Sequence, residues 1–191
     1  MIMFRLRNAL LPLIFVVAVP LVLVSGCKNG SGSVTYAQET GPAHFSFEYP
    51  SDYTVHTSDV SDTLIQLAFV DKTTMALDPS QQSWLKVDAF PADSATPDAA
   101  TAFDDEASAI GVLTVDVRTI EQISTTVAGV QGTGVAIQYR LTDQGSPILV
   151  RLVYFSKNGI IYGIHVGSAP ENAEVSKSLF DRLLKTLKIL D

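Results

Sequence analysis

The sequence predicts an α+β fold, in which an antiparallel β-sheet is flanked by helices, over residues 43–191. Most of this region alternates apolar and polar residues, which is the period of a half-buried strand. Residues 97–110, and the segment that begins at Pro170, instead carry apolar residues three and four positions apart, as amphipathic helices do. Asn158-Gly159 separates the last two predicted strands, and this dipeptide favours the tight turn of an antiparallel hairpin.

The first 26 residues have the layout of a signal peptide. Two arginines form a positive start, and residues 9–24 are an uncharged apolar run. This run is shorter than the ~20 residues of a membrane-spanning helix. It ends in VSGC, which resembles the lipobox of bacterial lipoproteins. The resemblance implies cleavage between Gly26 and Cys27 and acylation of the Cys27 thiol.

A lipid anchor at Cys27 would hold the protein on the extracytoplasmic side of the cell membrane or the outer membrane. Cys27 is the only cysteine, so no internal disulfide is possible. Without the arginines of the signal, the 13 Lys and Arg fall to 11 against 20 Asp and Glu, a formal charge of −9. This acidity argues against a nucleic-acid partner. Residues 28–42 are rich in Gly, Ser and Thr and are predicted to form a flexible tether.

Seven strands are predicted in the domain. The segment at 148–155 is apolar on both faces, which predicts a central strand covered on both sides. With its two neighbours it forms three long antiparallel strands between 130 and 167. The sequence GVQGTG at 129–134 is interpreted as a turn or a β-bulge, because a phosphate-binding loop would lead into a helix and not a strand. The seven strands are expected near 45–49, 53–57, 63–70, 85–89, 135–141, 148–155 and 160–166.

The two predicted helices differ in character. The first has a strongly acidic outer face, which we interpret as a solvated surface because the spacing of a calcium-binding loop is missing. The second has an apolar stripe with four-residue spacing, and Ser168 with Glu171 is predicted to form a capping box at its start. The acidic residues are Asp98, Asp104, Asp105 and Glu106, and the stripe is Val175, Leu179, Leu183 and Leu187.

Two ends of the domain resemble the PsbP-like superfamily, which includes photosystem accessory proteins and the DcrB-type and LpqN-type bacterial lipoproteins. The opening FSFEYPSDY at 45–53 and the closing LLKTLKIL at 183–190 are similar to the family's pattern. Where family members often have a tryptophan after the proline, this chain has Tyr53. The resemblance implies an α/β/α sandwich with an amphipathic C-terminal helix, and a binding or assembly role, usually without catalysis.

The residues themselves predict no catalytic site, no metal site and no cofactor. His44, His56 and His165 have no metal-ligand spacing and are interpreted as surface or second-face residues. No G-x-S-x-G nucleophile motif is present. Trp84 and Tyr53 are candidate interface residues, because aromatic side chains are enriched at binding hot spots.

These observations favour a lipid-anchored extracytoplasmic binding or assembly-accessory protein that is not an enzyme and that presents its domain to an envelope protein. Two alternatives remain open from the sequence. Apolar residues on both sheet faces are compatible with a pocket for a small apolar ligand between sheet and helix. A hydrolase would need one of the histidines to meet carboxylates in a cleft.

Overall fold

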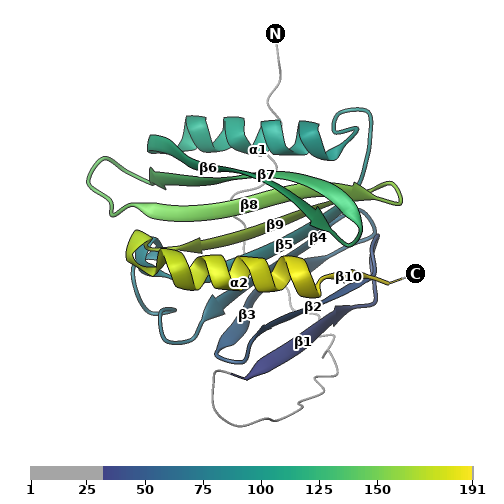
Figure 1. Ribbon diagram of the computed structural model, residues 1–191, viewed down its shortest axis with the longest axis horizontal. Helices are drawn as coiled ribbons and strands as arrows, with labels where there is room; N and C mark the ends of the chain where they lie inside the picture. The colour runs from purple at the N-terminus through teal and green to yellow at the C-terminus, as the bar shows by residue number, and fades with distance from the viewer. Residues whose placement is uncertain (1–31, 191) are drawn as a thin grey trace.

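The structure is a computed structural model, and it describes residues 32–190 (Figure 1). The predicted signal peptide at 1–26, its cleavage site between Gly26 and Cys27, and the predicted lipidation at Cys27 lie outside the described residues. Within the described part of the chain, no helix is both long and apolar enough to cross a membrane.

The strands form two antiparallel sheets. The larger sheet has the order β3-β4-β5-β9-β8-β7-β6, so β3 and β6 are its two edges. The smaller sheet has the order β1-β2-β10. The strands are β1 (Ser33–Gln38), β2 (Phe45–Pro50), β3 (Tyr53–Val60), β4 (Ile65–Asp71), β5 (Trp84–Pro91), β6 (Val115–Val127), β7 (Val130–Arg140), β8 (Ile148–Lys157), β9 (Ile160–Ser168) and β10 (Lys188–Ile189).

Helices cover both faces of the larger sheet. Helix α1 (Ala99–Leu113) lies across the β6–β9 half of one face, and helix α2 (Ala173–Thr186) lies on the other face beside the smaller sheet (Figure 1). Two short 3-10 helices, η1 (Pro79–Gln81) and η2 (Pro170–Asn172), precede β5 and α2. The larger sheet is therefore the middle layer of the domain.

A hydrophobic core fills each side of the larger sheet. The larger core packs the sheet against α2 and the smaller sheet, and its fully buried aromatic rings are Phe45, Phe47, Phe69, Phe155, Tyr162 and Phe180. The second core packs the sheet against α1. Full burial of a large apolar side chain contributes about 1.5–3 kcal/mol, so the aromatic core is a main source of the domain's stability.

The predicted α+β class is confirmed, and so are the three long antiparallel strands between 130 and 167. Strand β8 is buried on both faces, as its two-sided apolar pattern predicts. Asn158 and Gly159 have φ angles of 54° and 75°, as the tight turn between β8 and β9 requires. Ala128 and Gly129 also have positive φ angles, so the turn expected at the start of GVQGTG is present between β6 and β7.

The prediction of a flexible tether over 28–42 is wrong for Ser33–Gln38. These residues form β1, which pairs with β2 along its whole length. The ring of Tyr36 packs at 5.5 Å from that of Phe47, and Val34 also contacts the core. The folded domain therefore begins by Ser33, ten residues before the predicted boundary.

Other differences concern the ends of elements. Strand β6 is not predicted, because most of its residues are exposed and lack apolar alternation. Helix α1 begins at Ala99, where the Asp98 carboxylate accepts a hydrogen bond from the Thr101 N–H. The predicted capping box before α2 is wrong, because the Ser168 hydroxyl is buried and donates to the carbonyl of Ala169.

Candidate functional site

Tyr53, the first residue of β3, is buried in the larger core with 8% of its surface exposed. Burial raises the pKa of its phenol, and the charges of Asp71 and Asp52 raise this pKa further. Tyr53 therefore offers little surface to a partner, contrary to its prediction as an interface residue.

Trp84 lies at the start of β5, on the sheet face that carries α1. Its indole packs across the neighbouring strand onto Gly167, where a Cβ atom would overlap the ring. Trp84 also borders the second core, together with Phe90 and Phe103. It is half-buried, so its role in an interface stays a prediction.

The structure brings His165 together with three charged side chains beneath α1. Nε2 of His165 lies 3.5 Å from Oδ2 of Asp88, and Nδ1 lies 3.9 Å from Oε1 of Glu106 on the helix. The Lys86 ammonium lies 2.8 Å from the same Asp88 oxygen, and the Gln66 amide donates to the other oxygen. The sequence places these residues on one face of the sheet, but α1 adds Glu106.

Burial decides the charge of this cluster. It lowers the pKa of His165 to about 4, and the opposing effect of the Asp88 charge is smaller. Burial likewise raises the pKa of the Glu106 carboxyl. His165 is therefore neutral at pH 7, and the 3.5 Å contact with Asp88 is not an ion pair there. Nε2 of His165 is buried and has no hydrogen-bond partner among residues 32–190.

The buried position of His165 does not suit hydrolysis. His165 is 3% exposed and lines neither of the two pockets described below, whereas a general base must reach its substrate. His44 precedes β2 and His56 lies on β3, and both are exposed. The histidine and carboxylates therefore meet, but in the interior and not in a cleft.

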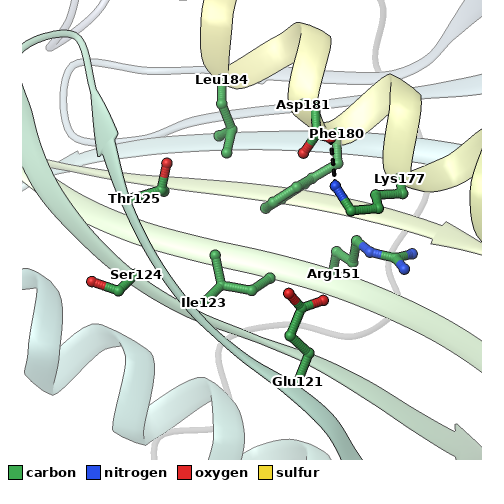
Figure 2. A pocket seen from close by; sticks show the side chains of 9 residues that line it. All are labelled: Glu121, Ile123, Ser124, Thr125, Arg151, Lys177, Phe180, Asp181 and Leu184. Carbon is green, nitrogen blue, oxygen red and sulfur yellow. Dashed lines mark hydrogen bonds and ion pairs between the residues drawn. The ribbon is translucent and has the colours of Figure 1, made fainter.

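A surface pocket lies between the C-terminal half of β6 and α2, and we name it the β6–α2 groove (Figure 2). It has a volume of about 180 Å³. Apolar side chains of both elements meet in it, with charged side chains on one side of them and hydroxyl side chains on the other. The residues that line it are Glu121, Ile123, Ser124, Thr125, Arg151, Lys177, Phe180, Asp181 and Leu184.

Lys177 and Asp181 are one turn apart on α2 and form an ion pair at the groove, with 2.6 Å between Nζ and Oδ2. Hydrogen bonding to Asp181 raises the pKa of Lys177. Both side chains are substantially exposed, so the pair contributes little to stability. Its two charges are instead available to a molecule that approaches the groove.

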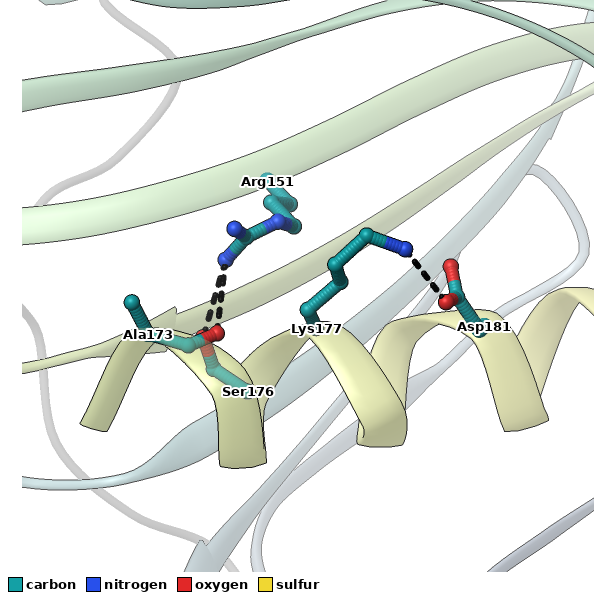
Figure 3. A network of polar contacts seen from close by, with 5 residues as sticks. All are labelled: Arg151, Ala173, Ser176, Lys177 and Asp181. Carbon is teal, nitrogen blue, oxygen red and sulfur yellow. Dashed lines mark hydrogen bonds and ion pairs between the residues drawn. The ribbon is translucent and has the colours of Figure 1, made fainter.

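Arg151 is the unusual residue of this site. It lies in the middle of β8, is 7% exposed, and donates from Nη1 to the Ala173 carbonyl at 3.3 Å and to the Ser176 hydroxyl at 3.0 Å (Figure 3). Its buried Nε has no hydrogen-bond partner within residues 32–190. No carboxylate in this part of the chain lies within 4.0 Å of the guanidinium. Arg151 is thus a buried cation that forms no ion pair with any carboxylate of residues 32–190.

The strand register explains why Arg151 opens towards the groove. Glu121 pairs with Ala136, and Ala136 pairs with Arg151, so Glu121 and Arg151 share a row two strands apart. Two strand spacings are about 10 Å. Ala136 between them is completely buried, and the side chains of Glu121 and Arg151 on either side of it both line the groove.

The outer side of β6 is an open sheet edge. β6 pairs only with β7 among the described strands. Val127 and Val130 flank the two-residue turn and exchange both hydrogen bonds. Counted back from Val127 along β6, the first, third and fifth residues therefore have backbone groups that face away from β7. Gln122, Ser124 and Thr126 therefore direct their backbone N–H and C=O groups away from the sheet.

The two halves of β6 differ in how this edge is protected. The N-terminal half has two register shifts, charged side chains, and Asp116 with a φ of 55°. Such irregularities prevent the addition of another strand. Residues 122–127, QISTTV, keep a regular register and carry no charge, glycine or proline. The unprotected half of the edge is the half that borders the β6–α2 groove.

A second pocket, of about 320 Å³, lies where the chain enters β2 and leaves β10. Ala43, His44, Ile160 and Ile189 are among the residues that line it. It lies at the periphery of the larger core, and the core residues themselves are almost completely buried.

No protein-family model and no curated protein sequence matches this chain. Solved structures do match it. LpqN of Mycobacterium tuberculosis, described as involved in cell envelope biogenesis, superposes with a TM-score of 0.56 at 11% identity, over 83% of this chain and 92% of LpqN. CyanoP, the cyanobacterial PsbP from Synechocystis, superposes with a TM-score of 0.56 at 13% identity, over 87% of this chain and 98% of CyanoP.

The Ran-binding protein Mog1p of Saccharomyces cerevisiae also has this fold, with a TM-score of 0.53 at 10% identity, over 82% of this chain and 97% of Mog1p. The chain therefore has a PsbP-like α+β fold. At these identities the likeness concerns the fold alone. In residues 32–190, no group of three or more His, Cys, Asp or Glu side chains is placed to hold a metal ion.

Sequence reasoning missed the β6–α2 groove, although one signal for it exists. Arg151 is a lone charge inside the apolar run ILVRLVYF, and the interior of a two-sided strand is a costly place for a charge. The groove itself also needs β6, whose exposed residues do not predict a strand.

Proposed function

We propose that this chain is a lipid-anchored, extracytoplasmic binding protein without catalytic activity that engages a partner protein of the cell envelope. Cys27 is the acylated residue in this proposal, and the domain from Ser33 onward carries the binding surface. The roles of two proteins with the same fold support it, since LpqN is involved in cell envelope biogenesis and Mog1p is a Ran-binding protein.

The observation that carries the proposal is the buried guanidinium of Arg151, which makes no ion pair and leaves its Nε without a hydrogen-bond partner among residues 32–190, beside an open strand edge. Burial of a charge without a counter-charge costs several kcal/mol. A binding role accounts for this cost, because an acidic group of a partner would supply the missing charge. Ser176 does not need the arginine, since its hydroxyl also donates to the carbonyl of Ala173.

The groove defines the chemistry of the partner. An extended segment that adds to β6 would exchange main-chain hydrogen bonds with Gln122, Ser124 and Thr126, as in other cases of strand addition. Alternate side chains of that segment would face α2. An apolar side chain would pack on the half-buried Ile123 and Leu184, and an acidic side chain would reach towards Arg151.

The ligand-carrier alternative has less support. Ligand pockets usually enclose about 300–1,000 Å³ and bury most of the ligand. The two pockets described above measure about 180 and 320 Å³ and lie at the surface. Only the second pocket reaches the lower end of that range, and a ligand in an open surface pocket would stay partly exposed.

The experiment compares two substitutions at Ser124. Ser124→Pro removes the outward backbone N–H but leaves the bonds to β7, because that N–H faces away from the sheet. Ser124→Ala keeps the N–H. Both variants lose the bond between the Gln131 amide and the Ser124 hydroxyl, so they differ in the backbone donor.

Affinity purification of the full-length, membrane-anchored protein should recover the same envelope partner with the wild type and with Ser124→Ala. Recovery should fall strongly with Ser124→Pro. Equal recovery by both variants would show that the partner does not pair with β6. The absence of any specific partner with the wild type would contradict the proposed function itself.

A further inference from the structure

A loop of seven residues, Lys72 to Asp78, follows β4 and exposes apolar side chains at its tip. We name it the Met75 loop. Met75 and Leu77 are 47% and 46% exposed. Ala76 between them is also exposed, so the tip presents three adjacent apolar residues to the outside.

The Met75 loop lies beside the point where the chain enters the domain. The carbonyl of Gly32, the first described residue, accepts a hydrogen bond of 2.7 Å from the Ser51 N–H. The Lys72 ammonium donates to the Ser51 carbonyl at 2.8 Å, and the Lys72 N–H donates to the Asp52 carbonyl at 2.9 Å. One turn, between β2 and β3, thus joins the chain entry to the base of the loop.

The chain entry cannot lie far from the proposed acylated residue. Five residue steps separate Cys27 from Gly32. A fully extended chain spans at most about 3.6 Å per residue, so this stretch reaches at most about 18 Å. The reach is this short because residues 33–38 belong to β1, whereas a tether that ended at residue 42 would allow a much longer reach.

The loop is built so that its tip can enter an apolar medium. The Gln82 amide donates to the carbonyls of both Met75 and Leu77, at 3.2 and 3.0 Å. The Leu77 N–H donates to the carbonyl of Thr74. Unsatisfied backbone groups are costly in hydrocarbon, and these bonds remove much of that cost before any membrane contact.

The charges of the loop lie at its base. Asp71 accepts hydrogen bonds from the backbone and hydroxyl of Thr73, and Asp78 caps η1. Lys72 lies on the side of the chain entry, where an ammonium group can face lipid headgroups while the apolar residues point inward. The apolar tip, with its charged residues confined to the base, matches the interface of a bilayer.

We propose that the Met75 loop inserts its tip into the membrane surface next to the lipid anchor and so fixes the orientation of the domain. This inference rests on the proposed acylation of Cys27. The acyl chains hold the protein on the membrane, and the loop determines which end of the domain faces it. β6 lies five strand spacings from β4, the strand that leads into the loop, or about 24 Å across the sheet. The β6–α2 groove is then held away from the lipid and open to a partner.

The test uses the acylated, full-length protein with one added cysteine. Acylation blocks the thiol of Cys27, the only natural cysteine, so an environment-sensitive NBD dye reacts with the new thiol alone. Met75→Cys reports on the tip of the loop. Thr63→Cys is the matched control, because Thr63 is exposed and precedes β4 at the opposite end of the strand from Lys72.

The labelled proteins are reconstituted into vesicles of phosphatidylethanolamine and phosphatidylglycerol. We expect a blue shift of the dye at position 75 and quenching by doxyl-labelled lipid, with neither effect at position 63. A dye at position 75 that stays in water, or equal signals at both positions, would overturn the inference. Flotation of the vesicles distinguishes failure of the loop insertion from failure of the proposed anchor. Acylated protein that does not float with the vesicles would contradict the anchor.

Discussion

Nε2 of His165 lies 3.5 Å from Oδ2 of Asp88, with both side chains buried beneath α1. The distance resembles that of an ion pair, but burial keeps the imidazole neutral and lowers its pKa to about 4. Lys86, Glu106 and the ring of Tyr154 complete the surroundings of the imidazole. Protonation of His165 therefore opposes folding.

This cluster predicts how stability depends on pH. The unfolded chain takes up a proton on this histidine near pH 6.5, whereas the folded chain does so near pH 4. The contribution of the neutral His165 to the free energy of unfolding is complete above pH 6.5. It is lost as the pH falls towards 4, by up to about 1 kcal/mol per pH unit. Urea unfolding of the Cys27→Ser protein across this range measures it.

The control for this prediction is His165→Leu. Glu106 shifts in the opposite sense, because its raised pKa favours the folded state as the pH falls, but it is present in both proteins. The difference between the two proteins in how the free energy of unfolding changes with pH therefore reports on His165. Parallel pH profiles for the two proteins would contradict a buried neutral histidine.

The contact between Trp84 and Gly167 predicts a second stability effect. Gly167→Ala places a methyl group against the indole, and overpacking of this kind costs about 1–3 kcal/mol. Gly111→Ala is the matched control, since no atom lies within 4 Å of a Cβ at this position in α1. Alanine is the better helix former, so this change should stabilise by up to about 1 kcal/mol.

Thermal unfolding of both alanine variants distinguishes the two environments. A lower melting temperature for Gly167→Ala and an equal or higher one for Gly111→Ala are expected. If Gly167→Ala is as stable as the wild type, the indole does not lie where the structure places it.

Most of the β-structure could be predicted from the sequence, because strands near the centre of the sheet bury residues in alternation. β4 buries Ile65, Leu67 and Phe69 on one face, and each of them is apolar. The edges do not follow this rule. β6 is largely exposed and polar, so nothing in its sequence requires burial.

The composition around β1 favours a linker, although its residues alternate as those of a strand do. Val34 and Tyr36 alternate with Ser33 and Thr35, as in a half-buried strand. The Gly and Ser residues that precede them favour the interpretation as a linker. The candidate groove could not be predicted, because it depends on which edge strand lies next to α2, and residue patterns along one chain do not fix that arrangement.

Arg151→Met should separate stability from binding. The substitution replaces a buried cation that makes no ion pair with an apolar side chain of similar length, so the cost of keeping a charge in the interior is removed. We expect an unfolding free energy at least equal to that of the wild type, measured in urea. Recovery of the envelope partner should nevertheless fall.

Arg151→Lys keeps the charge in this comparison but not the geometry of the guanidinium. We expect it to retain part of the binding. A large loss of stability in Arg151→Met, with partner recovery unchanged, would mean that the arginine serves the fold alone.

Cys27→Ser should abolish acylation and release the protein from membranes. Mass spectrometry of the purified protein detects the acyl chains, and fractionation detects the release. Lys28→Ser, one residue along, is the control and should leave acylation intact. Membrane association and acylation that survive in Cys27→Ser would contradict the proposed anchor.

The most direct test of the account is site-specific photo-crosslinking in living cells. A photoreactive amino acid replaces Thr126 on the open edge at β6, or Ser58 on the opposite edge strand β3, and both positions are exposed. The account predicts one crosslinked envelope protein from position 126, lost when Ser124→Pro is added, and none from position 58. Crosslinks from position 58 alone, or a crosslink at 126 that survives Ser124→Pro, would contradict a binding surface at β6.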